Sequence, residues 1–465
     1  MDKHLTSMRF LILTLYFFSL TSAFAQKLDV KLSDALKTLQ VDDQFKHASI
    51  SMYVVDQNGK AVIEKNIEIG LAPASCLKVV TSTSALSLLG GNYSYDTEIG
   101  LSGNNLQTIY IKSSGDPTFG SWRWSQTSMD TINNTIKSAI KKYNLKGHSM
   151  NVILDESIFN SQATPNGWTW DDIGNYYGAG ARAMNWHENQ YDMLLQPGKK
   201  VGDSVWVIRT EPKLTVLEIV NELKTGAAGS GDNSVIYLPE DVEIAHLRGT
   251  VPLGKDLFTI SGAMPNGGWS FLFSLRSLLI SEGVDPNGLE INHDKNNVPS
   301  DMIAMKWIKS PSLDSINYWF LKRSVNLYGE AFVKTIGYIK AEDGSTEGGL
   351  KVMKDFWEKN GIDRSALHII DGSGLSPANR ITTHALVQVM QYAKKQTWFP
   401  SFYLALPEIN GIKMKDGYIG GVRSFTGYVK SKDGNEYTFS FIVNNFDGSA
   451  GTVREKMWRI LDILK

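Results

Sequence analysis

Apolar residues recur along this chain with two different spacings, which divide it into regions. A period close to 3.6 residues predicts helices over residues 28–41, 313–339, 349–360, 383–395 and 454–464. Alternation of apolar and polar residues predicts strands over residues 49–55, 61–64, 421–430 and 436–444. Residues 71–90 join a proline-containing loop to a long apolar helix. This order predicts an α+β fold, in which one antiparallel sheet is covered by the terminal helices and faces an all-helical half.

The middle of the chain has a different character. Between about residues 92 and 299 the pattern changes to short strands, Gly and Asn turns and brief helices. A chain of 465 residues is too long for a single core, so several domains are expected. We therefore predict one discontinuous domain from residues 26–95 and 300–465, with residues 96–299 inserted as one or two small, strand-rich domains.

The amino terminus has the features of an export signal. Lys3 and Arg9 precede an apolar run over residues 10–20, and Ala23-Phe24-Ala25 before Gln26 is a typical cleavage site. We predict a signal peptide over residues 1–25 and a periplasmic mature protein, with an uncleaved anchor as the alternative. No other apolar run approaches the ~20 residues needed to span a bilayer, so no membrane span is expected after cleavage.

Charge and cysteine content exclude several classes of function. The net charge is -1, and about -2 without the signal peptide, so we expect no nucleic-acid partner. Cys76 is the only cysteine and the eight histidines are scattered, which predicts no disulfide, no metal site and no cofactor. With no histidine near it, Cys76 is better interpreted as a small buried helix residue than as a nucleophile.

Ser75 stands where the loop meets the apolar helix, and Lys78 follows three residues later. On a helix this spacing puts both side chains on one side of a single turn. A serine hydroxyl becomes nucleophilic when a neighbouring base takes its proton, and free N–H groups at a helix start favour the charge that develops on an attacked carbonyl. Ser138 and Lys141 have the same spacing, but their amphipathic surroundings predict an exposed surface helix. Ser75 and Lys78 are therefore the candidate acyl-transfer pair.

Six segments carry a resemblance to a known family. They are PASCLK (73–78), SSGDPTFGS (113–121), YGAGARAMNWHENQYD (177–192), SVNLYGEAFVK (324–334), DGSGLSPANRIT (371–382) and GVRSFTGYV (421–429). In this order they resemble the class C low-molecular-mass penicillin-binding proteins, which are D-alanyl-D-alanine carboxypeptidases/endopeptidases. The resemblance implies a penicillin-binding, serine β-lactamase-like transpeptidase domain built from residues 26–95 and 300–465, with accessory domains inserted after the nucleophile helix.

The resemblance also implies roles for individual residues. Ser75 would be the nucleophile and Lys78 the base that takes its proton. Ser324 would relay a proton to the leaving amine, and Asn326 would hold the substrate amide. The alternative for Ser324 is an ordinary helix N-cap, the usual reason for a serine at a helix start.

The third motif of the family has two candidate positions. A literal Lys-Thr-Gly at 224–226 ends the apolar pattern LTVLEIVNELKTG, which predicts a helix terminus, and it precedes Ser324 although the family motif follows that serine. We therefore choose Lys415-Asp416-Gly417. Lys415 would help keep Lys78 unprotonated and attract the substrate carboxylate, Gly417 would allow close approach, and the Tyr418 N–H would form an oxyanion hole with that of Ser75. Asp416 departs from the usual Thr or Ser, and we expect strand alternation to turn it away from the pocket.

These expectations define a serine-type peptidase. The implied substrates are D-alanyl-D-alanine ends or D-alanyl cross-links of peptidoglycan stem peptides, and β-lactams would be covalent inhibitors. The alternatives are a wall-binding protein that has lost turnover and a β-lactamase, although a small drug needs no inserted domains. Because every proposed catalytic group lies outside residues 96–299, we expect that span to be dispensable for acylation but required on polymeric wall.

Overall fold

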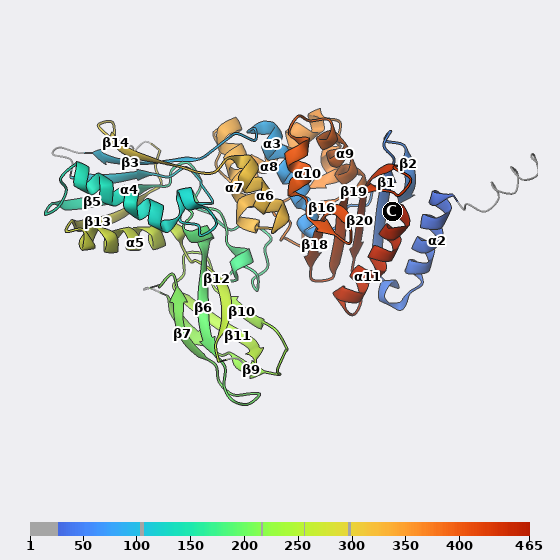
Figure 1. Cartoon of the computed structure of the whole chain (residues 1–465), viewed down its shortest axis with the longest axis horizontal. Helices are drawn as coiled ribbons and strands as arrows, with labels where there is room; N and C mark the ends of the chain where they lie inside the picture. Colours follow the sequence, from blue (N-terminus) through green and yellow to red (C-terminus); the bar gives the residue numbers. More distant parts are fainter. Residues whose placement is uncertain (1–26, 103–106, 215–216, 255, 296–298) are drawn as a thin grey trace, which may run out of the picture.

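The computed structural model describes residues 27–102, 107–214, 217–254, 256–295 and 299–465. Figure 1 shows an elongated molecule, with a helix-covered sheet near the chain ends, a second sheet at the opposite end, and a strand-rich lobe that projects from one side. The predicted signal peptide, residues 1–25, lies outside the described residues. Within the described part of the chain, no helix is long and apolar enough to span a bilayer.

Six antiparallel strands form the sheet near the chain ends, in the order β17-β18-β19-β20-β1-β2. Their bounds are β1 Ser49–Val55, β2 Ala61–Lys65, β17 Glu408–Ile409, β18 Ile412–Ile419, β19 Val422–Lys430 and β20 Glu436–Asn444. β1 pairs with β20 in a register that places Ser49 opposite Asn444, so the first and last strands of the chain meet inside the sheet. Residues 438–443 of β20 are all buried, as expected for a strand covered on both faces. The sequence pattern predicted β1, β2, β19 and β20, but not β17 or β18.

The terminal helices cover one face of this sheet. α2 (Leu28–Gln40) and α11 (Ala450–Leu461) place their apolar stripes in one core with the inward side chains of the strands. That core includes Leu32 and Leu36 of α2 and Met457 of α11. The sequence predicted both α2 and α11. α11 begins at Ala450 rather than at residue 454, because Ser449 caps this start by accepting a hydrogen bond from the Gly451 N–H.

An all-helical lobe contacts the other side of the sheet. Its helices are α3 Lys78–Leu88, α6 Leu313–Lys322, α7 Asn326–Ala341, α8 Thr346–Lys359, α9 Thr383–Lys394 and α10 Phe399–Ala405. Residues 78–86 of α3 are all buried, because α6, α7 and α9 pack around this helix. α3 is therefore a central helix, in which apolar residues and small Ser and Thr residues are buried on every side of residues 78–86.

The helical pattern predicted over residues 313–339 forms two helices, α6 and α7, and the second begins beside Ser324, where a helix start was expected. Arg323 ends α6, and Ser324 adopts a left-handed backbone conformation with φ 58°. A left-handed non-glycine residue cannot continue an α-helix, so a corner forms there. The corner points the Ser324 side chain toward the start of α3, where Ser75 lies.

The inserted region begins with a mixed sheet in the order β13-β5-β4-β3-β14. Its elements are β3 Asp96–Ser102, β4 Thr108–Lys112, α4 Met129–Lys142, β5 Ser149–Asp155, α5 Gly267–Ser281, β13 Asp285–Asn292 and β14 Ile303–Lys309. α4 and α5 contribute to its core. β14 pairs with β3, although the predicted boundary at residue 299 separates them. The division of the chain into domains stays a prediction.

The projecting lobe of Figure 1 contains two smaller sheets, β12-β6-β7 and β10-β11-β8, with β9 paired to β11. The strands are β6 Gln190–Gln196, β7 Trp206–Glu211, β8 Glu218–Asn221, β9 Lys224–Gly226, β10 Asn233–Tyr237, β11 Ile244–Pro252 and β12 Phe258–Ala263. The helix predicted to end at Lys224-Thr225-Gly226 is wrong, because this segment forms β8 and β9 instead. Both strands pair in parallel with β11, and tertiary pairing has overridden the apparent helical period.

Short elements complete the chain. They are β15 Leu367–His368, β16 Arg380–Ile381, and the 3-10 helices η1 Asp43–Phe45, η2 Ala74–Leu77, η3 Ser125–Thr127, η4 Tyr176–Gly178, η5 His187–Asn189, η6 Arg364–Ala366 and η7 Asp462–Leu464.

Candidate active site

Ser75 and Lys78 lie where η2 continues into α3. Ser75 is inside the 3-10 turn, and Lys78 is the first residue of the α-helix. Side chains three residues apart eclipse one another on a 3-10 turn, which brings the two functional groups together. The distance from Lys78 Nζ to Ser75 Oγ is 3.0 Å. Ser75 is partly exposed and Lys78 is completely buried, so the hydroxyl is accessible while the amine behind it is dry.

Two further oxygens surround the Lys78 amine. Asn326 Oδ1 and the Ser373 carbonyl oxygen each lie 2.6 Å from Nζ. Both can only accept hydrogen bonds, so they take two N–H groups of the amine. In the uncharged amine, the remaining lone pair then points toward Ser75 Oγ. This arrangement suits an amine that removes a proton from the serine hydroxyl.

The surroundings of Lys78 favour its neutral form. The pKa of Lys78 is lowered from 10.5 to about 7, mainly by burial and in smaller part by the positive charge of Lys415. The carboxylates of Asp371, Glu330 and Asp416 act in the opposite direction. A substantial fraction of free amine is therefore present at neutral pH, as a general base requires.

Ser324 faces Ser75 from the corner between α6 and α7. The Ser324 hydroxyl donates to Ser75 Oγ at 3.1 Å. The alternative interpretation of Ser324 as an N-cap is wrong, because Val325 occupies the cap position of α7 and no side chain caps the helix. Asn326 follows as the first helical residue. The structure therefore brings Ser75, Lys78, Ser324 and Asn326 together.

The predicted third motif lies on β18, beside η2. Lys415 is buried, and the thiol of Cys76 donates to its backbone carbonyl at 3.2 Å. A Cβ atom at Gly417 would come within 2.7 Å of the Pro73 carbonyl oxygen and 2.9 Å of the Ser75 nitrogen. Glycine therefore lets β18 run alongside the serine turn. The Tyr418 side chain is exposed, with the Arg423 guanidinium 5.4 Å from the centre of its ring.

Strand alternation predicted that Asp416 turns away from the pocket, and in the structure its carboxylate forms an ion pair with Lys415. The long lysine side chain bends back, and its Nζ lies 3.2 Å from Asp416 Oδ1 and 2.7 Å from the Asp416 carbonyl oxygen. Burial by itself would raise the pKa of Asp416, but the charge and hydrogen bond of Lys415, with the charge of Arg423, hold that pKa below its usual value. The positive charge of Lys415 thus has an internal counter-ion.

The two candidate motifs that the sequence analysis rejected lie away from Ser75. Ser138 and Lys141 are exposed on α4, where the Ser138 hydroxyl donates to the Asn134 carbonyl of its own helix. Lys224 is exposed on β9, which Figure 1 shows at the end of the projecting lobe, away from α3 and α7. The surface interpretation of the first pair is confirmed. Cys76 is also buried as predicted, and burial raises the pKa of its thiol to about 11, so it stays protonated.

Sequence reasoning missed the groups that hold the Ser373 carbonyl in place. The buried carboxylate of Asp371 accepts hydrogen bonds from the backbone N–H groups of Gly374 at 2.8 Å and Ser376 at 2.7 Å. The buried Glu330 accepts from the Gly372 N–H at 3.0 Å. Burial and the negative charge of Asp371 raise the pKa of Glu330 to about 8. The segment DGSG already marked this loop in the sequence, but its spacing gave no sign of these contacts.

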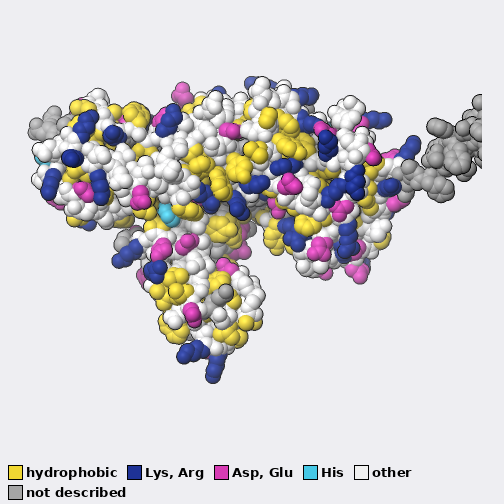
Figure 2. Space-filling view, in the orientation of Figure 1, with side chains coloured by type: hydrophobic (Ala, Val, Ile, Leu, Met, Phe, Trp, Pro, Cys, Tyr) yellow, Lys and Arg dark blue, Asp and Glu magenta, His cyan; other side chains and the backbone are white. Residues whose placement is uncertain are grey.

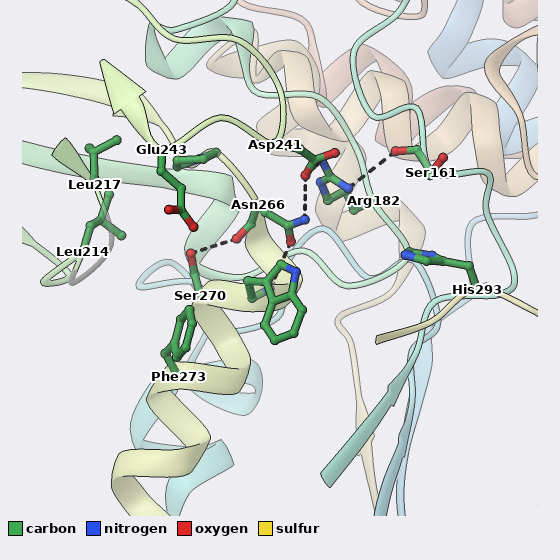
Figure 3. A pocket seen from close by; sticks show the side chains of 12 residues that line it. Ser161, Arg182, Leu214, Leu217, Asp241, Glu243, Asn266, Ser270, Phe273 and His293 are labelled. Atoms are coloured by element: carbon green, nitrogen blue, oxygen red, sulfur yellow. Dashed lines mark hydrogen bonds and ion pairs between the residues drawn. The ribbon is translucent and has the colours of Figure 1, made fainter. Parts of the chain in front are cut away.

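A separate cavity of about 450 Å³ lies in the inserted region (Figure 3). Arg182 reaches this cavity and binds Asp241 at 2.7 Å. Phe273 and Ser270 line it from α5, and His293 lies opposite. None of the residues predicted for the acyl-transfer site lines this cavity, so it is distinct from the Ser75 site.

No group of three or more His, Cys, Asp or Glu side chains that could hold a metal ion occurs among the described residues. On the face shown in Figure 2, basic and acidic side chains are interspersed, which agrees with the near-zero net charge.

The fold and the Ser75 site together define a serine hydrolase with the penicillin-binding fold. The model of the D-Ala-D-Ala carboxypeptidase 3 (S13) family matches residues 32–412. The chain belongs to this family.

Individual relatives agree with this assignment. The chain is 24% identical to a D-alanyl-D-alanine carboxypeptidase of Actinomadura sp. (strain R39), over 90% of this chain and 82% of the relative. It is 20% identical to the D-alanyl-D-alanine carboxypeptidase DacB of Haemophilus influenzae, over 89% of this chain and 87% of that protein. The crystal structure of penicillin binding protein 4 from Haemophilus influenzae superimposes with a TM-score of 0.78 at 17% identity, covering 93% of this chain and 99% of the other. The predicted α+β fold and the family resemblance are confirmed.

Proposed function

We propose that this protein is a serine-type DD-peptidase that cleaves the D-alanyl-D-alanine end, or a D-alanyl cross-link, of peptidoglycan stem peptides. The observation that carries the proposal is the position of the Lys78 amine, 3.0 Å from Ser75 Oγ and held by two acceptors at 2.6 Å. Membership of the D-Ala-D-Ala carboxypeptidase 3 family supports the same substrate class.

The reaction proceeds in two steps. Lys78 takes the Ser75 proton, and Oγ attacks the carbonyl carbon of the penultimate D-alanine to form an ester. The C–N bond to the last residue breaks, and the proton passes through Ser324 to the leaving amine. The Ser75 and Tyr418 N–H groups stabilise the tetrahedral oxyanion. Water then hydrolyses the ester and regenerates Ser75.

Lys415 and Asn326 bind the substrate. Asn326 forms hydrogen bonds with the peptide amide, and Lys415 attracts the terminal carboxylate. Because Asp416 pairs with Lys415 at 3.2 Å, an incoming carboxylate competes with an internal one. This competition favours substrates whose binding depends less on a terminal carboxylate, such as D-alanyl cross-links, so we infer a substantial endopeptidase component.

The proposed site of action is the periplasm, reached through the signal peptide of residues 1–25. The proposed partners are peptidoglycan stem peptides, with β-lactams as covalent inhibitors, and no nucleic acid or cofactor takes part. A wall-binding protein without turnover is the alternative, and a β-lactamase is a further one that the large inserted region disfavours.

Digestion of purified cell-wall fragments tests the proposal. We expect the mature protein to remove single alanines or to convert cross-linked dimers into monomers, as measured by mass spectrometry, and Ser75→Ala to do neither. Penicillin should add one covalent adduct to the native protein and none to Ser75→Ala. An adduct that persists in Ser75→Ala would refute the nucleophile, and wall binding without products would favour the non-enzymatic alternative. Rapid release of hydrolysed penicillin would instead indicate a β-lactamase.

A further inference from the structure

The direction of the Lys78 lone pair depends on the two oxygens that accept hydrogen bonds from its amine. The role of that lone pair rests on the proposed function. An uncharged amine has two N–H groups and one lone pair. Asn326 Oδ1 and the Ser373 carbonyl oxygen are the two oxygens that can direct the N–H groups. If either acceptor moves, the amine can rotate, and its lone pair no longer points at Ser75 Oγ.

The first acceptor is held by the inserted region. Asn326 Nδ2 donates to the backbone carbonyl of Tyr177 at 2.7 Å. This contact fixes the amide so that its oxygen, not its NH₂ group, faces Lys78. The Tyr177 carbonyl is itself held in the η4 turn, where the Gly178 N–H donates to the Asn175 carbonyl at 2.8 Å.

The second acceptor is held by the same segment. The indole N–H of Trp168 donates to Asp371 Oδ2 at 3.0 Å, and the Ser376 hydroxyl donates to the Gly167 carbonyl at 2.8 Å. Asp371 organises the buried loop that presents the Ser373 carbonyl to Lys78. The inserted region therefore contacts this loop from outside through two hydrogen bonds.

We propose that Gly167, Trp168 and Tyr177 of the inserted region together aim the Lys78 amine at Ser75, because they fix both of its acceptors. This proposal replaces the expectation that residues 96–299 are dispensable for acylation. The inserted region contributes no reacting atom, but the catalytic centre needs its hydrogen bonds to hold the two acceptors of Lys78 in place.

Acylation by a fluorescent penicillin under saturating conditions tests the proposal in the full-length mature protein. Trp168→Phe keeps an aromatic side chain but removes the indole N–H that donates to Asp371. Gly178→Ala adds a methyl group that would overlap the Asp172 carbonyl oxygen and displace the Tyr177 turn. Trp170→Phe, at a position 55% exposed in the same segment, is the matched control. We expect the first two variants to lose about ten- to hundredfold in the acylation rate constant, with unchanged non-covalent affinity in Trp168→Phe, and the control to match the wild type.

The pH dependence separates a positioning role from other effects. With the pKa of Lys78 at about 7, the wild-type amine is mostly neutral at pH 9, and a loss caused by a misdirected lone pair persists there. A loss in Trp168→Phe that disappears at pH 9 would overturn the proposal, and so would a wild-type rate in either Trp168→Phe or Gly178→Ala when thermal unfolding shows that the variant is folded. A wild-type protein that forms no adduct at Ser75 would instead refute the proposed function itself.

Discussion

At the scale of single residues, the charges around Lys78 set the pH range in which the site works. Burial and the positive charge of Lys415 lower the pKa of Lys78 to about 7, against the opposing negative charge of Asp416. Lys415 and Asp416 are adjacent in sequence and paired in space, so their effects on Lys78 oppose each other. Replacing either one should therefore move the pH profile in a predictable direction.

We expect the acylation rate of the wild type to rise with pH through about 7, because only the free amine of Lys78 can take the serine proton. Lys415→Ala removes a positive charge, which raises the pKa of Lys78 and moves this rise to higher pH. Asp416→Asn removes a negative charge and moves it to lower pH. Stopped-flow acylation across pH 5–10 measures both shifts.

Steady-state turnover of a D-alanyl-D-alanine peptide compares the chosen third motif, residues 415–417, with the Lys-Thr-Gly sequence at residues 224–226. Lys415→Ala should lose most of this activity, whereas Lys224→Ala on the distant β9 should lose almost none. Shifts of the same sign in Lys415→Ala and Asp416→Asn, or a large loss in Lys224→Ala, would contradict the assignment of the third motif to β18.

At the scale of elements, the site depends on how closely β18 approaches the η2 turn. Gly417 stands opposite Ser424 in the antiparallel pairing of β18 and β19, and the Ser424 hydroxyl donates to the Pro73 carbonyl at 2.5 Å. The sheet is thereby joined to the turn that carries Ser75. A side chain at position 417 would have to push these two elements apart.

Gly417→Ala should reduce acylation by about a hundredfold or more, because the methyl group would move β18 away from Ser75 and disturb the oxyanion hole. Gly420→Ala in the same hairpin is the matched control, since nothing lies within 4 Å of its Cβ position. The rate constant for β-lactam acylation is the measurement. A wild-type rate in Gly417→Ala would show that β18 does not need this close approach.

At the scale of the whole molecule, α7 connects the catalytic lobe to the inserted region. The Tyr328 hydroxyl donates to Glu188 Oε1 at 2.7 Å and accepts from the Trp124 indole N–H at 3.2 Å. Farther along α7, the buried Lys334 donates to Asn160 Oδ1 at 3.0 Å. Because Tyr328, Glu188 and Lys334 are buried, each of these three polar side chains depends on its partner across the contact.

Tyr328→Phe should lower the free energy of unfolding by about 1–3 kcal/mol, because it leaves the Trp124 N–H without an acceptor and removes a donor from buried Glu188. Denaturant unfolding measures the change. The control is Tyr176→Phe, at a position 53% exposed, which should stay within about 0.5 kcal/mol of the wild type. Equal stabilities for the wild type and Tyr328→Phe would show that this contact does not hold α7 against the inserted region.

The sequence by itself determined four of the six strands of the main sheet, most of the long helices and the candidate groups at Ser75, Lys78, Ser324 and Asn326. These features depend on short-range physics. The spacing of apolar residues specifies whether a segment forms a helix or a strand. A spacing of three residues places two side chains on the same turn of a helix. The choice of residues 415–417 over 224–226 also came from order along the chain.

Only the tertiary structure decided the rest. The break at Ser324 and the pairing of β8 and β9 with β11 override the local helical pattern, because contacts with distant residues outweigh weak intrinsic propensities. The position of Asp416 against Lys415, and the contacts of Trp168 and Tyr177 with the catalytic loops, join groups with no common sequence pattern. Folding also made Lys78 a base, because it removes the amine from water and places the positive charge of Lys415 near it.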